Sequence, residues 1–213
     1  MAPARSPELR GRRLAVAAVL IAAVAAGAIG YSTGRLSALT QGVPSTFSVE
    51  AGFARDMQTH HDQGVEMAML IYERTDDDDV RLLAYDIATT QAQQSGQMYG
   101  WLSIWNAPQY SSEPPMSWMS EHDEHGGSGG GPMPGMASPE QLDQLRSAEG
   151  PAADRLFLEL MIDHHQGAVE MADAVLALSD DPDVTSLAES IVQSQTAELK
   201  LLRELLAAVP TAP

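Results

Sequence analysis

The sequence predicts an all-α protein, a four-helix bundle built from two repeated helical hairpins with an N-terminal targeting helix before it. Three observations support this fold class. Residues 57–68 and 161–172 align without a gap at a constant offset (164 − 60 = 104). Apolar residues around both copies recur at spacings of three and four, the period of an amphipathic helix. A long Pro- and Gly-rich interval separates the copies, so each must form its own hairpin, and two hairpins bury their apolar faces by packing together.

The composition limits both the compartment and the partners. The chain of 213 residues has a formal net charge of −17 and contains no cysteine. A strongly acidic surface repels nucleic acid and favours cations, which excludes nucleic-acid binding. Without cysteine the chain has neither disulfides nor a thiolate metal site.

The N-terminus has the pattern of a targeting segment. Four arginines precede an uncharged stretch from Leu14 to Gly34, which at ~20 residues is long enough to span a bilayer. Basic residues before an apolar run are typical of a signal peptide or a signal anchor. We assign residues 1–36 to this segment and 37–48 to a linker. The bundle is then expected outside the cytoplasm, held at the cell membrane by the N-terminal helix, or secreted if the segment is cleaved.

The first hairpin is expected over residues 49–106. Its first helix runs from about Val49 to Thr75, with a stripe at spacings of three and four formed by Phe53, Met57, His60, Gly64, Met67 and Ile71. Four consecutive acids, Asp76 to Asp79, interrupt the pattern. The second helix runs from about Asp79 to Trp105, and its predicted buried side consists of Leu82, Leu83, Ile87, Met98, Trp101 and Leu102.

The second hairpin is expected over residues 151–209. Its turn, Asp180-Asp181-Pro182-Asp183, is the counterpart of the acidic run in the first copy. Asp before Pro at a helix start is capping chemistry, so we interpret both runs as N-capped turns and not as calcium loops. The last helix runs from about Pro182 to Val209, with a buried side of Leu187, Ile191, Leu199, Leu202 and Leu206. Gln91 and Gln195 occupy equivalent positions, and either a hydrogen bond to a histidine or exposure to solvent is consistent with them.

The interval over residues 107–150 is predicted to be a flexible crossover between the second and third helices. It contains several prolines and a glycine-rich run, with one short helix from about Pro139 to Ala148. A long crossover at this place also occurs in ferritin-like folds.

The repeated segment concentrates metal-binding chemistry. It holds four of the six histidines of the chain, as one His-His pair in each copy. At about 100° per residue, the methionines three before and seven after the first histidine share its stripe. Imidazole and thioether together are the ligands of copper, with sulfur suited to Cu(I). If the two stripes face each other, they predict a three- or four-coordinate copper site with the candidate ligands Met57, His60, His61, Met67, Met161, His164, His165 and Met171.

A second candidate group lies in the crossover. Met116, Met119, His122 and His125 follow a strict spacing of three, and Met133 and Met136 come after them. A mobile segment of this kind could capture copper without prior folding, for acquisition or transfer. The alternative is a polar linker in which these residues are incidental.

Other metals fit the pattern less well. A di-iron bundle needs Glu-x-x-His on two helices, but Met57 and Met161 stand three residues before His60 and His164. The His-x-x-x-His spacing of helical zinc sites is also absent from the repeats. Methionine is a common core filler, so a purely structural role for these side chains stays open.

At the level of motifs the chain resembles the bacterial domain-of-unknown-function family 305. The hallmark of that family, Met-Ile-x-His-His-x-x-Ala-x-x-Met-Ala and often present twice, matches residues 161–172, and the preceding Met133-Pro134-Gly135-Met136 and Asp154-Arg155-Leu156-Phe157 also match. The resemblance covers most of residues 47–209. It implies an exported ferritin-like bundle, with copper binding and tolerance in some members. The ligands it implies are His60, His61, Met67, His164, His165 and Met171.

The two copies differ from each other at two places. Gln63-Gly64 stands where the second copy has Gly167-Ala168, and Gln94 stands where the second copy has Glu198. We therefore leave the equivalence of the two predicted sites open.

These observations together predict an extracytoplasmic copper-binding protein for sequestration or delivery. Its expected partners are the metal ion, the membrane through the N-terminal helix, and a copper-transfer partner or a second copy in a homodimer. Two alternatives remain: a cell-envelope interaction module with structural His and Met, and a metal-dependent redox enzyme.

Overall fold

The computed structural model describes residues 19, 22–33, 42–122 and 132–210. The chain divides into two units, Met1–Val43 and Pro44–Pro213. Residues 22–33 of the first unit are helical, and the Thr33 hydroxyl donates to the backbone oxygen of Ile29 at 2.9 Å. In the described part of the chain, no helix has both the length and the apolarity to cross a membrane. The stretch predicted as an anchor, residues 14–34, lies partly outside the described residues.

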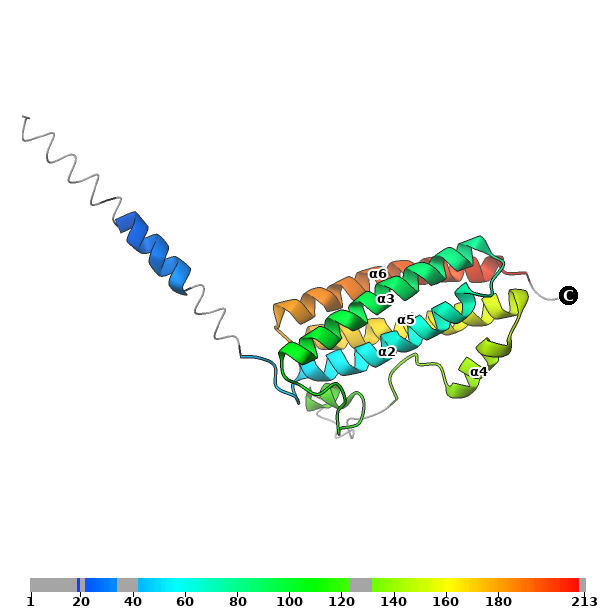
Figure 1. The fold of residues 1–213 in the computed structure, drawn as a ribbon, viewed down its shortest axis with the longest axis horizontal. Coiled ribbons are helices and arrows are strands. Elements are labelled where there is room, and N and C mark those ends of the chain that lie inside the picture. The colour runs from blue at the N-terminus through cyan, green and yellow to red at the C-terminus, as the bar shows by residue number, and fades with distance from the viewer. Residues whose placement is uncertain (1–18, 20–21, 34–41, 123–131, 211–213) are drawn as a thin grey trace, which may run out of the picture. The chain divides into compact units, whose positions relative to one another are not determined.

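The second unit is a helical bundle, which confirms the predicted all-α class. Four long helices run side by side (Figure 1): α2 (Val49–Tyr72), α3 (Asp78–Ile104), α5 (Gly150–Leu178) and α6 (Pro182–Ala208). Helix α2 packs along α3 and α5 packs along α6, while the two hairpins meet mainly through α2 and α5. The helices that carry the His-His pairs therefore form the interface between the hairpins.

Side chains of the predicted type cap the helices. The Asp77 carboxylate accepts hydrogen bonds from the backbone of Asp79 at 2.9 Å and Val80 at 3.1 Å, and Asp181 caps α6 in the same way. Each cap pairs backbone N–H groups that have no partner within the helix. The interpretation of both acidic runs as capped turns is confirmed.

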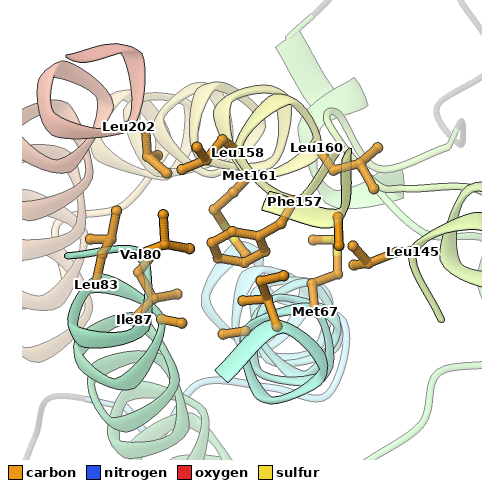
Figure 2. Packing of buried hydrophobic residues seen from close by; sticks show 14 of the residues in the cluster. Met67, Val80, Leu83, Ile87, Leu145, Phe157, Leu158, Leu160, Met161 and Leu202 are labelled. Atoms are coloured by element: carbon orange, nitrogen blue, oxygen red, sulfur yellow. The ribbon is translucent and has the colours of Figure 1, made fainter. Parts of the chain in front are cut away.

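The core consists of two apolar clusters along the bundle. The first contains Met67 and Met161 together with Phe157, as Figure 2 shows. The second contains Met57 and Met171. Each cluster thus takes one methionine from α2 and one from α5, so these two helices run antiparallel and the His-His pairs lie between the clusters.

One predicted core position is wrong. Leu82 is 60% exposed, whereas Leu83 and Ile87 are buried. Adjacent helical residues point about 100° apart, so Leu82 and Leu83 cannot both face the core, and the spacing of four to Ile87 selects Leu83. Trp101 is only half-buried and stacks on Trp105 with a ring centroid distance of 5.8 Å.

Much of the crossover packs against the bundle, contrary to the predicted flexible excursion. It contains a short 3₁₀ helix, η1 (Ser117–His122), and the helix α4 (Pro139–Ser147). Trp118 is 6% exposed, and its ring meets Phe53 edge-on at a centroid distance of 5.8 Å. Its indole N–H donates to Asp56 at 2.8 Å. The crossover is held because it supplies apolar side chains that cover the end of α2.

Candidate metal centre

Eight polar side chains lie among the four long helices, two on each helix. We call this set the polar layer: His60, His61, Gln91, Gln94, His164, His165, Gln195 and Glu198. The four histidines are 0% exposed and Gln91 and Gln195 are each 2% exposed, so the layer is interior. These two glutamines do not face solvent, and their amide atoms make no hydrogen bond to a histidine either, so neither alternative for them is observed.

His60 and His164 face each other across the interface between α2 and α5. Their ring centroids are 3.9 Å apart with an interplanar angle of 32°. The His164 Nε2–H donates to the backbone oxygen of His60 at 2.8 Å, and the His60 Nε2–H donates to the backbone oxygen of Pro134 at 2.9 Å. The structure thus brings together the first histidine of each repeat, which meets the condition that the two stripes face each other.

The second histidine of each repeat has a side-chain partner from its own hairpin. His61 Nε2 lies 2.8 Å from Gln94 Oε1, and His165 Nε2 lies 2.6 Å from Glu198 Oε2. Gln94 and Glu198 are not among the histidine partners that the sequence predicts. A signal for them exists in the sequence, because both pairs have the same separation (94 − 61 = 33 and 198 − 165 = 33).

The hydrogen bonds fix which ring nitrogen is free. An oxygen acceptor at Nε2 requires the proton there, so the neutral ring has a bare lone pair at Nδ1. All four Nδ1 atoms are buried and unpaired, and so are both amide atoms of Gln91 and Gln195. Among the described residues, eleven buried side-chain polar atoms have no hydrogen-bond partner. Eight of the eleven belong to the polar layer.

Burial keeps three of these rings, His60, His61 and His164, neutral at pH 7. It lowers the pKa of His60 to about 4 and the pKa of His61 to about 3. Burial also lowers the pKa of His164 well below its ordinary value, and the neighbouring histidines add to the effect. A metal ion binds only unprotonated imidazole, so protons hardly compete with a metal for these rings.

The methionines of the repeats flank the polar layer on both sides. Met57, Met67, Met161 and Met171 are all 0% exposed and belong to the two apolar clusters. Within the described residues, no three His, Asp or Glu side chains assemble into a metal-binding group. The donor set on offer is therefore imidazole nitrogen with thioether sulfur beside it, which fits a soft copper ion better than zinc or iron.

The crossover candidates are dispersed. Met116 is 7% exposed with φ 64°, and Met119 and Met133 pack against the second apolar cluster. Met136 lines a surface pocket of about 340 Å³ next to Gly135. His122 ends η1, but its side chain and all of His125 lie outside the described residues. At least three of these thioethers therefore lie against the bundle and not on a free segment.

One crossover segment, residues 133–137, explains why one copy has Gln63 where the other has Gly167. A Cβ on Gly167 would lie 2.0 Å from the backbone oxygen of Pro134, so only glycine leaves room for the segment there. On α2, Gln63 Nε2 donates to the oxygen of Ala137 at 2.9 Å, and the N–H of Ala137 donates to Gln63 Oε1 at 2.7 Å. Gln63 and Gly167 occupy equivalent positions in the two copies. Gln63 hydrogen-bonds the segment from α2, and Gly167 leaves room for it on α5.

Gly64 allows a second close approach. A Cβ at this position would lie 2.1 Å from Gln91 Oε1 and 2.7 Å from His164 Cε1. The missing side chain therefore lets a glutamine of α3 and a histidine of α5 reach the same point on α2.

Comparison with known structures identifies similar bundles. A DUF305 protein from Streptomyces coelicolor is 43% identical with a TM-score of 0.71, over 77% of this chain and 95% of that one. A DUF305 fragment from Deinococcus radiodurans is 34% identical with a TM-score of 0.62, over 75% and 96%. CopM in its Cu(II)-bound form is 27% identical with a TM-score of 0.55, over 76% and 97%.

Comparison with the curated proteins gives no match. The sequence profile of DUF305, a domain of unknown function, matches residues 50–206. This range includes the polar layer and, except for Val209, every buried residue of the two apolar clusters. The chain therefore belongs to the DUF305 family.

Proposed function

We propose that this protein binds copper outside the cytoplasm, for sequestration or delivery, through the polar layer and its flanking methionines. One observation carries the proposal. Four buried histidines each have an oxygen acceptor at Nε2 and an unpaired Nδ1. This is the arrangement of a metal-ligating histidine, whose other ring nitrogen donates to a carboxylate, amide or backbone oxygen that fixes the tautomer.

The choice of copper rests on the donor atoms. Imidazole and thioether select copper among the common metals, and the absence of cysteine leaves no thiolate for zinc. CopM, at 27% identity, has been solved with Cu(II) bound, which supports the same ion here. Thioether ligation favours Cu(I), so storage or transfer suits this donor set better than redox turnover.

The location rests on the N-terminal charge pattern and on a relative. Arginines before an apolar stretch are typical of export, and the Streptomyces coelicolor relative is described as a secreted protein. We assign residues 1–36 to a signal anchor or a cleaved signal peptide. We also place the bundle among ferritin-like folds, because a long crossover joins its second and third helices. A copper-transfer partner and a homodimer stay predictions.

Copper titrations of the purified full chain test the proposal. Stoichiometry and affinity are measured for Cu(I) under reducing conditions and for Cu(II) under oxidising conditions. We expect the fourfold variant with His60, His61, His164 and His165 changed to Ala to lose tight binding. The matched control, with His122 and His125 changed to Ala, should keep it. Circular dichroism establishes that both variants fold.

The opposite result supports the alternative. If the folded fourfold variant binds copper as the wild type does, or if the wild type binds only weakly, the histidines are structural. The cell-envelope interaction module then becomes the leading hypothesis.

A further inference from the structure

The two halves of the polar layer differ in one charge. In the first half, His61 is bonded to the neutral amide of Gln94, whereas in the second half His165 is bonded to the carboxylate of Glu198. The helix positions and the ring nitrogen are the same in both halves. The repeat therefore provides two versions of one site that differ in the formal charge behind the imidazole.

In the described part of the chain, Glu198 has no lysine or arginine partner. Among the ion pairs of the described residues, Glu198 pairs only with His165. Lys200, two residues further on α6, is 81% exposed in its side chain and its nearest acid is Glu204 at 3.9 Å. The Glu198 side chain is 22% exposed, so solvent screens it only in part. Its negative charge is available to a cation bound at His165.

Asp62, beside His61, does not restore the balance in the first half. It is exposed, and it accepts the hydroxyl hydrogen of Ser95 at 2.6 Å. An exposed carboxylate is screened by water and salt, so its effect on an interior ion is small.

From this asymmetry we propose that Glu198 makes the half of the layer with His164 and His165 selective for a divalent cation. The half with His60 and His61, where Gln94 is neutral, then prefers a soft monovalent cation. The proposal rests on the proposed copper function and extends it from binding to the choice of ion charge. A carboxylate behind an imidazole makes the ring a stronger donor and offsets part of the charge of the ion. The Coulomb energy is proportional to the charge of the ion, so a divalent cation gains about twice what a monovalent cation gains.

The test compares the binding of a divalent ion and a monovalent ion to the full chain. Cu(II) in an oxidising buffer is the divalent probe, and Ag(I) is the monovalent probe. The variants are Glu198→Gln, Gln94→Glu and the control Glu189→Gln, which removes the same charge from an exposed position of α6. Glu198→Gln reproduces the residue that the first copy already has at this place, so the fold is expected to persist, and circular dichroism checks it.

The expected result is a split between the two ions. Losing an outer partner of a ligand weakens metal affinity by about 10–100-fold, so Glu198→Gln should weaken Cu(II) binding by about that factor. The corresponding loss for Ag(I) should be about 3–10-fold, because the monovalent ion gains half as much in free energy. Gln94→Glu should strengthen Cu(II) binding in the first half, and Glu189→Gln should change neither ion.

Three outcomes overturn the proposal in different ways. Equal weakening of Cu(II) and Ag(I) by Glu198→Gln would mean that Glu198 only orients His165. If Glu198→Gln and Glu189→Gln weaken metal binding equally, the loss of affinity comes from the net charge of the protein and not from the position of Glu198. A wild type that binds neither ion refutes the proposed copper function itself, and the charge selectivity with it.

Discussion

The close approach at Gly64 allows a quantitative test of the polar layer. Adding one methyl group, as in Gly64→Ala, places a Cβ 2.1 Å from Gln91 Oε1 and 2.7 Å from His164 Cε1. Both neighbours are buried and must move away. Overpacking of this kind costs about 1–3 kcal/mol, while the higher helix propensity of alanine returns about 1 kcal/mol. The net change in the free energy of unfolding is a loss of about 0–2 kcal/mol.

Gly96 is the matched control. It also lies inside a helix, α3, but a Cβ at this position would meet nothing within 4 Å. Gly96→Ala should therefore stabilise the protein by about 1 kcal/mol from helix propensity alone. The propensity terms cancel between the two variants. The remaining difference of about 1–3 kcal/mol corresponds to a difference of about 2–12 °C in Tm for a domain of this size.

Thermal unfolding and copper titration of both variants provide the assay. Gly64→Ala should unfold at a lower temperature than Gly96→Ala and should bind copper more weakly than the wild type, because the His164 ring is displaced. If Gly64→Ala is stabilised as much as Gly96→Ala, there is no close approach at this point. The proposed packing of the polar layer would then be wrong.

Three further predictions concern pH and the crossover. Folding lowers the pKa of His60 to about 4 and of His61 to about 3, so the unfolded chain binds more protons below pH 6.5. The free energy of unfolding should then fall as the pH drops from 6.5 to about 4, by up to about 1.4 kcal/mol per pH unit for each ring. Equal urea midpoints at pH 7 and pH 5 would contradict this prediction. Gly167→Ala pushes against a backbone oxygen of the crossover, which cannot rotate away, and should destabilise the protein by about 1–3 kcal/mol in urea unfolding. Trp118→Phe removes the indole donor of the half-buried Asp56, which keeps the backbone N–H of Met116, and should lower stability by about 1–3 kcal/mol. Proteolysis in residues 107–122 should become faster, and unchanged proteolysis would show that this contact does not hold the crossover.

The bundle could be predicted because its signals are local and repeated. The spacing of three and four defines the helices, and Asp77 and Asp181 mark two of their starts. The error at Leu82 arose where two adjacent leucines offered the same apolar signal. The spacing of four residues from Leu83 to Ile87 distinguishes the two leucines, and the structure buries Leu83 and Ile87.

The site was predicted in part. The duplicated motif pointed to the four histidines, and the structure brings the first histidine of each repeat together across the interface of the hairpins. The partners at Nε2 were missed because they come from other segments, 33 residues away for His61 and 74 residues away for His60. The crossover was interpreted as mobile from its Pro and Gly content. Its attachment depends on tertiary contacts, such as the one between Trp118 and Gly52, that composition does not reveal.

The energetics of the polar layer argue against a purely structural role. A buried polar atom without a partner costs about 1–3 kcal/mol, and eight such atoms lie in this layer. The whole stability of a domain is only about 5–15 kcal/mol. Apolar side chains of similar volume would remove this cost, because the clusters on both sides already pack aliphatic residues. Four of the eight atoms are imidazole lone pairs that accept a cation and donate nothing, and buried polar groups that a fold keeps at such expense are typical of functional sites. In the proposed function, a soft cation supplies the partner that these four nitrogen atoms lack.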